Sequence, residues 1–104
     1  MDNPGGEIIL VEVDRELMTI VPEYLVMRRW ECAEIKRLLA SGDMAGIQTL
    51  AHRMKGSGGS FGFDEISAIG EVLEWAAEIP DTGSIGSAVD RLERYLACVS
   101  VTYV

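Results

Sequence analysis

Basic residues and histidine are scarce in this chain of 104 residues. Nine lysines and arginines stand against seventeen acidic residues, so the formal net charge is −8. A chain this acidic lacks the basic footprint that nucleic-acid binding requires. Long apolar runs are also missing, and none approaches the length of a membrane span. We therefore expect neither a nucleic acid nor a membrane among its partners.

Cysteine is equally rare, with Cys32 and Cys98 as its only copies. Their separation fits neither a zinc site nor a redox pair. Both fall within apolar helical patterns, which favours buried free thiols in a reducing compartment, although a disulfide between them stays open. The N-terminal segment lacks the charged and apolar regions of a signal peptide. We expect a cytoplasmic protein.

Apolar periodicity predicts helices through most of the chain. A first helical region is expected over residues 14–40, with a break near Val21 or a new helix starting at Pro22. Gly42 should end this region, and Asp43 should cap the second helix.

Two more helices are expected downstream, the third capped by Asp64 and the fourth by Ser84, with a turn over residues 80–83 between them. Short connections favour antiparallel neighbours, so the prediction is an all-α fold, an antiparallel up-down four-helix bundle. The chain is then one domain with an N-terminal arm, a helical bundle and a C-terminal arm over residues 1–13, 14–98 and 99–104.

The chain ends are apolar and lie outside the bundle pattern. Residues 99–104 alternate with period two, as a strand would, and residues 8–11 are a short apolar run. On the first long helix, Val26, Trp30 and Ala33 form a second apolar stripe on the side opposite the inward one. One hypothesis is that the two ends pair as short strands, or pack as extended arms, against this second stripe. The competing hypothesis is a homodimer through Trp30; a monomer is the first expectation.

The single histidine lies on the polar side of the second helix. At about 100° per residue, the apolar residues of this helix gather on one side. Nearly opposite them lie Gln48, His52, Lys55, Gly56 and Gly59. His52 therefore points away from the core, which argues against a hydrogen-bonded core histidine. An exposed histidine without a role remains the alternative.

Glycines surround this histidine. Each interior helical glycine costs about 1 kcal/mol relative to alanine. Gly56 and Gly59 flank His52 on the same face, and bare positions there leave room for a docking partner. The alternative is that the glycines only end the helix. That alternative fits Gly62 but fits Gly56 poorly, because Phe61 continues the apolar stripe beyond it.

The segment resembles the histidine phosphotransfer (HPt) domain family. The matching motif is H-x-x-K-G-S, here His52, Lys55, Gly56 and Ser57, followed by Phe61-Gly62. The approach to the histidine, Gly42-Asp43 and then Leu50-Ala51-His52, also looks like that family, as does Leu73-Glu74-Trp75-Ala76-Ala77. The resemblance covers roughly residues 14–97.

This resemblance implies a phosphocarrier that exchanges a phosphoryl group with aspartates of response-regulator receiver domains, supplied by a hybrid histidine kinase. His52 would be the phosphoacceptor, with neutral imidazole as the attacking form, and Lys55 would stabilise the phosphoryl oxygens. The chain would bind no cofactor, and the divalent metal would sit on the receiver. Partner docking would involve the remaining outward positions, Gln48, Arg53, Gly56, Ser57 and Gly59.

Other functions are weighed against this one. A non-catalytic helical module that docks a receiver or another signalling partner is the main alternative. A kinase dimerisation domain also carries a helical histidine, but no ATP-binding domain follows here. A hydrolase dyad of His52 with Ser57 or Ser60 lacks an orienting carboxylate in the sequence.

Two charged groups are interpreted as solvated surface. Glu71, Glu74 and Glu78 lie at helical spacing and are expected to form a solvated edge. The basic cluster of Arg28-Arg29 and Lys36-Arg37 is expected to be a solvated helix face.

Overall fold

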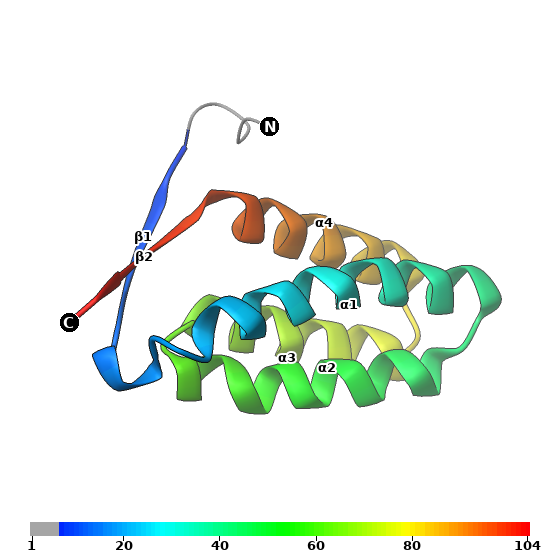
Figure 1. Ribbon diagram of the computed structural model, residues 1–104. Helices are drawn as coiled ribbons and strands as arrows, with labels where there is room; N and C mark the ends of the chain where they lie inside the picture. Colours follow the sequence, from blue (N-terminus) through cyan, green and yellow to red (C-terminus); the bar gives the residue numbers. More distant parts are fainter. Residues whose placement is uncertain (1–6) are drawn as a thin grey trace.

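The computed structural model describes residues 7–104, which form four α-helices and two short strands (Figure 1). The helices are α1 (Val21–Ser41), α2 (Met44–Gly58), α3 (Asp64–Glu78) and α4 (Thr82–Cys98). The strands are β1 (Ile9–Val13) and β2 (Val99–Tyr103), and two 3-10 turns are η2 (Arg15–Leu17) and η3 (Gly59–Phe61). Each helix contacts the next, and α1 also contacts α4, which closes the bundle. The predicted antiparallel up-down four-helix bundle is confirmed.

The boundaries of α1 and the start of α2 follow from local sequence. Pro22 sits in the first turn of α1, where its missing N–H leaves no hydrogen bond broken. The helix ends at Gly42, whose backbone φ of 77° is rare for residues other than glycine. Asp43 caps α2, because its Oδ1 accepts the Gly46 N–H at 2.9 Å. All three predictions are confirmed.

The predicted caps of α3 and α4 are wrong. Asp64 is the first residue of α3 rather than its cap, and Phe63 takes the cap position. Phe63 is held there because its side chain is buried and its backbone N–H donates to Gly58 O at 2.8 Å. In α4 the cap is Asp81, whose Oδ1 accepts the Ser84 N–H at 3.1 Å. Ser84 lies inside the helix and donates its hydroxyl to Asp81 Oδ2 at 2.8 Å, so the preceding turn ends before residue 82.

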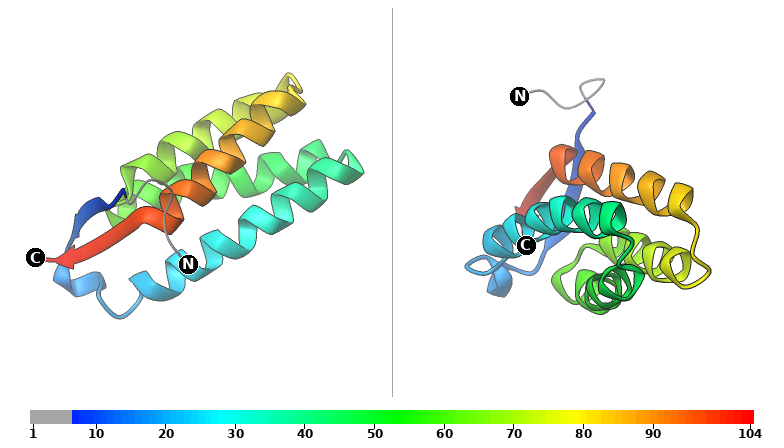
Figure 2. Two further views of the ribbon diagram at one scale, coloured as in Figure 1. Left: turned by 90° about the horizontal axis from the view of Figure 1, so that it is seen from above. Right: turned by 90° about the vertical axis from the view of Figure 1, so that its right-hand side faces the viewer.

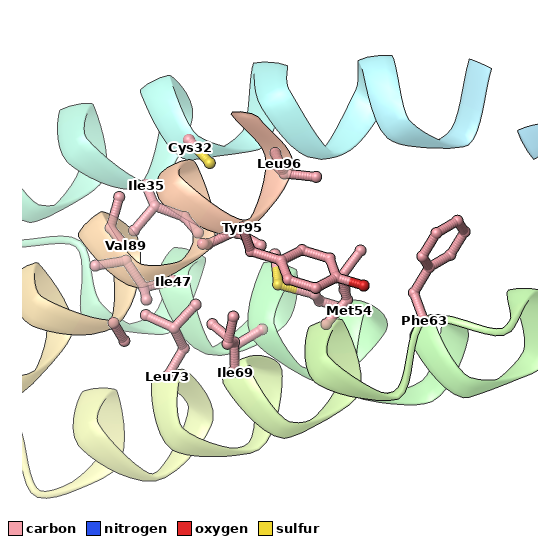
Figure 3. Close-up of a cluster of buried hydrophobic side chains, with 14 of the residues drawn as sticks. Cys32, Ile35, Ile47, Met54, Phe63, Ile69, Leu73, Val89, Tyr95 and Leu96 are labelled. Carbon is pink, nitrogen blue, oxygen red and sulfur yellow. The ribbon is translucent and has the colours of Figure 1, made fainter. Parts of the chain in front are cut away.

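The core is one contiguous cluster to which all four helices contribute (Figure 3). Its largest fully buried side chains are Phe63, Ile35, Ile47, Met54, Ile66, Ile69, Leu73, Ile85 and Leu92. Cys32 and Cys98 are both buried and free, as predicted. Burial raises the pKa of the Cys32 thiol to about 11, which leaves it protonated and unreactive near neutral pH. None of the helices described combines the length and apolar character of a bilayer span.

The two chain ends pair as parallel strands, which confirms the predicted pairing. Ile9 lies opposite Val99, and Val13 lies opposite Tyr103. The pairing is parallel because η2 turns the chain back into α1, so β1 runs in the same direction as α4 and β2 (Figures 1 and 2). The strands cover the end of the bundle instead of the second stripe of α1: Val26 and Trp30 stay 56% and 57% exposed.

Helices α2 and α3 approach each other to backbone contact. A Cβ placed on Gly70 of α3 would lie 2.6 Å from the backbone N of Lys55, and one placed on Gly58 of α2 would lie 2.6 Å from that of Ser67. Ser67 locks the contact, because its hydroxyl donates to Lys55 O and accepts from Gly59 N–H, both at 2.8 Å. Only glycine fits at these two positions, so they set the register between the helices.

Gly70→Ala should therefore lower the free energy of unfolding by about 1–3 kcal/mol, because the added methyl group forces two backbones apart. Gly86→Ala is the matched control, since Gly86 lies inside α4 with nothing within 4 Å of an added Cβ. It should raise the free energy of unfolding by about 0.5–1 kcal/mol. Urea denaturation followed by circular dichroism measures both values. Equal effects of the two substitutions would contradict the tight α2–α3 contact.

Candidate functional site

His52 stands on the exposed face of α2, with its side chain 73% exposed. The buried residues of α2 lie on the other side of the helix: Ile47, Ala51, Met54 and Gly58. The ring Nδ1 of His52 lies 2.9 Å from Oε2 of Glu74, which projects from α3. An ionised carboxylate can only accept, so Nδ1 is the donor and the neutral ring carries its proton there. Nε2 then keeps its lone pair, and it bonds to no group in the part of the chain that the structure describes.

Glu74 also forms an ion pair with Lys55, the lysine of the motif. Its second oxygen, Oε1, lies 3.7 Å from Nζ of Lys55, whose side chain is 46% exposed. The Glu74 side chain is 28% exposed. Ion pairs this open to solvent contribute about 0–1 kcal/mol to stability. The arrangement thus matters less for holding the fold than for fixing the histidine ring and keeping a cation beside it.

Glu74 is the functional residue that sequence reasoning missed. The prediction that it belongs to a solvated edge is wrong, although Glu71 and Glu78 are exposed. His52 and Glu74 are 22 residues apart on different helices, and apolar periodicity says nothing about the register between two helices. A usable signal was Gly70, one turn before Glu74, because an interior glycine on a buried stripe points to a close helix approach.

The positions around His52 are open. Gly56 is exposed, and a Cβ placed there would meet no atom within 4 Å. At Gly59, also exposed, the nearest atom to such a Cβ would be Asp64 Oδ1 at 3.5 Å, which is ordinary contact. Arg53 is exposed and Gln48 is half-buried. No described residue therefore obstructs the predicted docking positions on this face.

Ser57 is placed elsewhere, between α1 and α2. Its Oγ lies 2.8 Å from the hydroxyl of Tyr24, and Arg28 NH1 donates to it at 3.4 Å. These contacts place the Ser57 hydroxyl in helix packing and remove it from the face of His52. They also leave no hydrolase dyad of His52 with Ser57, even though the carboxylate missing from the sequence argument is present as Glu74. Ser60 donates its hydroxyl to Gly56 O at 3.5 Å.

Most of the Arg28 side chain packs against α2 and only 12% of it is exposed, so the predicted solvated face is wrong for this residue. Its guanidinium lies over the Tyr24 ring at 4.4 Å from the centroid and donates from NH2 to Glu31 Oε2 at 3.0 Å. Arg28 Nε also lies 2.7 Å from Glu31 Oε1. These two atoms form an ion pair but not a hydrogen bond. Burial raises the pKa of the Glu31 carboxyl, and the Arg28 charge opposes that shift. This network fixes α1 against the helix that carries His52.

Metal-ligating side chains do not gather on the described surface. Within residues 7–104 there is no group of three or more histidines, cysteines or acidic residues that could hold a metal ion. At the site itself, His52 has one carboxylate beside it and a lysine nearby. The arrangement suits a nucleophilic nitrogen with a fixed tautomer.

Comparison with known proteins assigns most of the chain to a family. The family model described as Hpt domain matches residues 29–100, a span that includes His52, Lys55 and Glu74. No curated protein matches the chain, and no solved structure does.

The hydrogen bond to Glu74 predicts the tautomer of His52. Glu74→Ala should shift the neutral ring away from the Nδ1–H form, because the acceptor that fixes that proton is lost. Two-bond proton–nitrogen correlation spectra of the ring, recorded above the histidine titration, report this directly. Glu71→Ala removes an acid one turn away and should leave the tautomer unchanged. An Nε2–H ring in the unsubstituted protein would contradict the geometry described.

Proposed function

Since this chain belongs to the Hpt domain family, the phosphotransfer modules of two-component systems, we propose that it relays a phosphoryl group between aspartates of receiver domains through His52. The observation that carries the proposal is the exposed side chain of His52, whose ring proton is held at Nδ1 by Glu74. The partners would be response-regulator receiver domains and the receiver of a hybrid histidine kinase.

The chemical step follows from this tautomer. Nε2 of the neutral ring attacks the phosphorus of an aspartyl phosphate; the N–P bond forms, the P–O bond to the aspartate breaks, and the aspartate leaves as a carboxylate. The phosphorylated ring is then cationic. The Glu74 carboxylate, 2.9 Å from Nδ1, offsets that charge. Transfer to the next receiver reverses the step, and Glu74 keeps the proton at Nδ1 throughout.

Lys55 would stabilise the phosphoryl oxygens. It lies one helical turn from His52, with its Nζ 3.7 Å from Glu74 Oε1 and nearly half its side chain in solvent. An ammonium on a flexible stem can move from a carboxylate to a phosphoryl group as negative charge arrives. The divalent metal of the reaction would be bound by the receiver domain.

Docking of a receiver would use the bare strip of α2 beside His52. An interior glycine costs a helix about 1 kcal/mol. None of the residues 7–104 requires one at Gly56, since no atom among them lies within 4 Å of an added Cβ. A partner backbone can use that space. Arg53 and Lys55 provide positive charge for the acidic pocket of a receiver, while Gln48 and Gly59 border the same surface.

A non-catalytic docking module is the alternative function. It would need the exposed face of α2 but not a histidine with a fixed tautomer beside a lysine. The His52–Glu74–Lys55 geometry therefore favours the carrier.

A transfer assay tests the proposal. Receiver domains phosphorylated by a small-molecule donor should label the protein at His52 with an acid-labile, alkali-stable phosphoryl group, detected by mass spectrometry. ATP alone should give no label. His52→Gln should abolish transfer while receiver affinity stays within about threefold. Binding without label from any receiver would favour the docking module instead.

Gly56 allows stability and function to be separated. Gly56→Ala should raise the free energy of unfolding by about 0.5–1 kcal/mol, because alanine is the better helix former and has space there. The same substitution should weaken receiver binding about fivefold or more, the equivalent of about 1 kcal/mol, if a partner backbone occupies that space. Isothermal titration measures the affinity.

Gly86→Ala is again the matched control, since its added Cβ also meets no atom within 4 Å and it lies on α4. It should stabilise the protein similarly and leave receiver binding unchanged. Unchanged binding by Gly56→Ala would remove this glycine from the docking surface.

A further inference from the structure

A groove of about 530 Å³ runs along β1, at the end of the bundle where the two strands pair. Residues 9–12 of β1 form one wall, and Gly62, Asp64 and Glu65 form the other. Tyr95 of α4 lines it as well. Four successive strand residues line one wall, so the groove follows the edge of the strand rather than one face of the sheet.

This edge of β1 carries unpaired backbone groups. Val13 O accepts the Val104 N–H at 2.9 Å, so the backbone N–H and C=O of Val13 point toward β2. Consecutive residues of a strand point their N–H and C=O to alternate sides. The backbone N–H and C=O groups of Leu10 and Glu12 therefore point away from β2. On that side of β1 the described residues provide no third strand. A free strand edge is a ready template for another strand.

The chemistry of the groove selects the occupant. Glu12 and Asp64 have no ion pair with any described residue, whereas Glu65 is bound by Arg91 at 2.7 Å. Leu10 is 76% exposed. The groove thus offers two free carboxylates, one apolar side chain and a strand edge, which together suit an extended segment with basic and apolar residues.

Tyr95 is a second, independent sign of a ligand. It is only 5% exposed, yet its hydroxyl has no hydrogen-bond partner among the described residues. Its ring extends toward Phe63 with the hydroxyl leading (Figure 3). Burial, and then the neighbouring Glu65 and Asp64 carboxylates, raise the pKa of this hydroxyl to about 12. The hydroxyl itself is not sealed from solvent, because the buried side-chain atoms without a partner are Arg28 Nε and Glu31 Oε1. An unpaired donor that opens into the groove beside two carboxylates is a position where a bound backbone or side chain would gain a hydrogen bond.

We propose that the groove along β1 binds an extended basic segment of a partner protein, which adds as a short third strand beside Leu10. The added strand is short, because the groove narrows at Gly62, where a Cβ would lie 3.6 Å from Glu12 O. Its backbone pairs with Leu10, and its basic side chains face Glu12 and Asp64. A second copy of this chain is disfavoured, because two such edges would bring four unpaired carboxylates together.

The proposal is independent of phosphotransfer at His52, and a peptide experiment tests it. The probe is a fluorescein-labelled hexapeptide of alternating lysine and valine; a peptide of alternating glutamate and valine is the control. Anisotropy should show saturable binding of the lysine peptide at least tenfold tighter than that of the glutamate peptide. Amide exchange at Leu10 should slow in the complex. His52→Gln should bind the peptide like the unsubstituted protein.

Two variants locate the binding. Leu10→Pro removes an N–H that faces the groove while leaving the N–H groups that pair with β2, and it should abolish binding. Glu12→Lys should weaken binding at least fivefold, whereas the matched charge reversal Glu16→Lys in η2 should change it less than twofold.

Three results would overturn the proposal. The first is binding of both peptides alike, and the second is binding that survives Leu10→Pro and Glu12→Lys. The third is a concentration-dependent dimer in light scattering that Leu10→Pro abolishes, which would assign the edge to a second copy of the chain.

Discussion

The backbone contact between α2 and α3 is the constraint on which the rest of this structure depends. Gly58 and Gly70 leave no side chain between the two helices, and Ser67 ties them with hydrogen bonds to Lys55 O and Gly59 N–H. A contact of this kind permits only one register, since any slip would drive a side chain into a backbone. That register places Glu74 one turn beyond Gly70, within 2.9 Å of the His52 ring.

The other side of α2 is fixed by polar packing. Ser57, Tyr24 and Arg28 join α1 to α2 beneath the exposed strip, and the buried Glu31 balances the arginine. His52 therefore stands on a helix that is held from two sides, and its ring is oriented by a third group. A rigid support of this kind lets an exposed side chain keep one geometry without being buried.

The two surfaces of interest are built mainly from different elements and adjoin where Gly59 lies beside Asp64. The His52 strip belongs to α2, whereas the groove beside β1 is lined by that strand, by Gly62 and by residues of α3 and α4. An even number of antiparallel helices returns the chain to its starting end, which is why the two termini can pair at all. Positive charge is concentrated near His52 in Arg53 and Lys55, while the groove is acidic, so the two surfaces would select partners of opposite charge.

Much of this protein could be predicted from its sequence, because the signals involved are local. The 3.6-residue period placed the helices and turned His52 outward, Gly42 and Asp43 marked one helix boundary, and period-two alternation marked the terminal strand. What depends on the register between helices could not be predicted. Glu74 at the histidine, Ser57 turned toward α1 and the burial of Arg28 all required knowing which turn of one helix meets which turn of another. The tertiary structure alone decided that, because side-chain volume at Gly58 and Gly70 sets the register and a helical period carries no information about it.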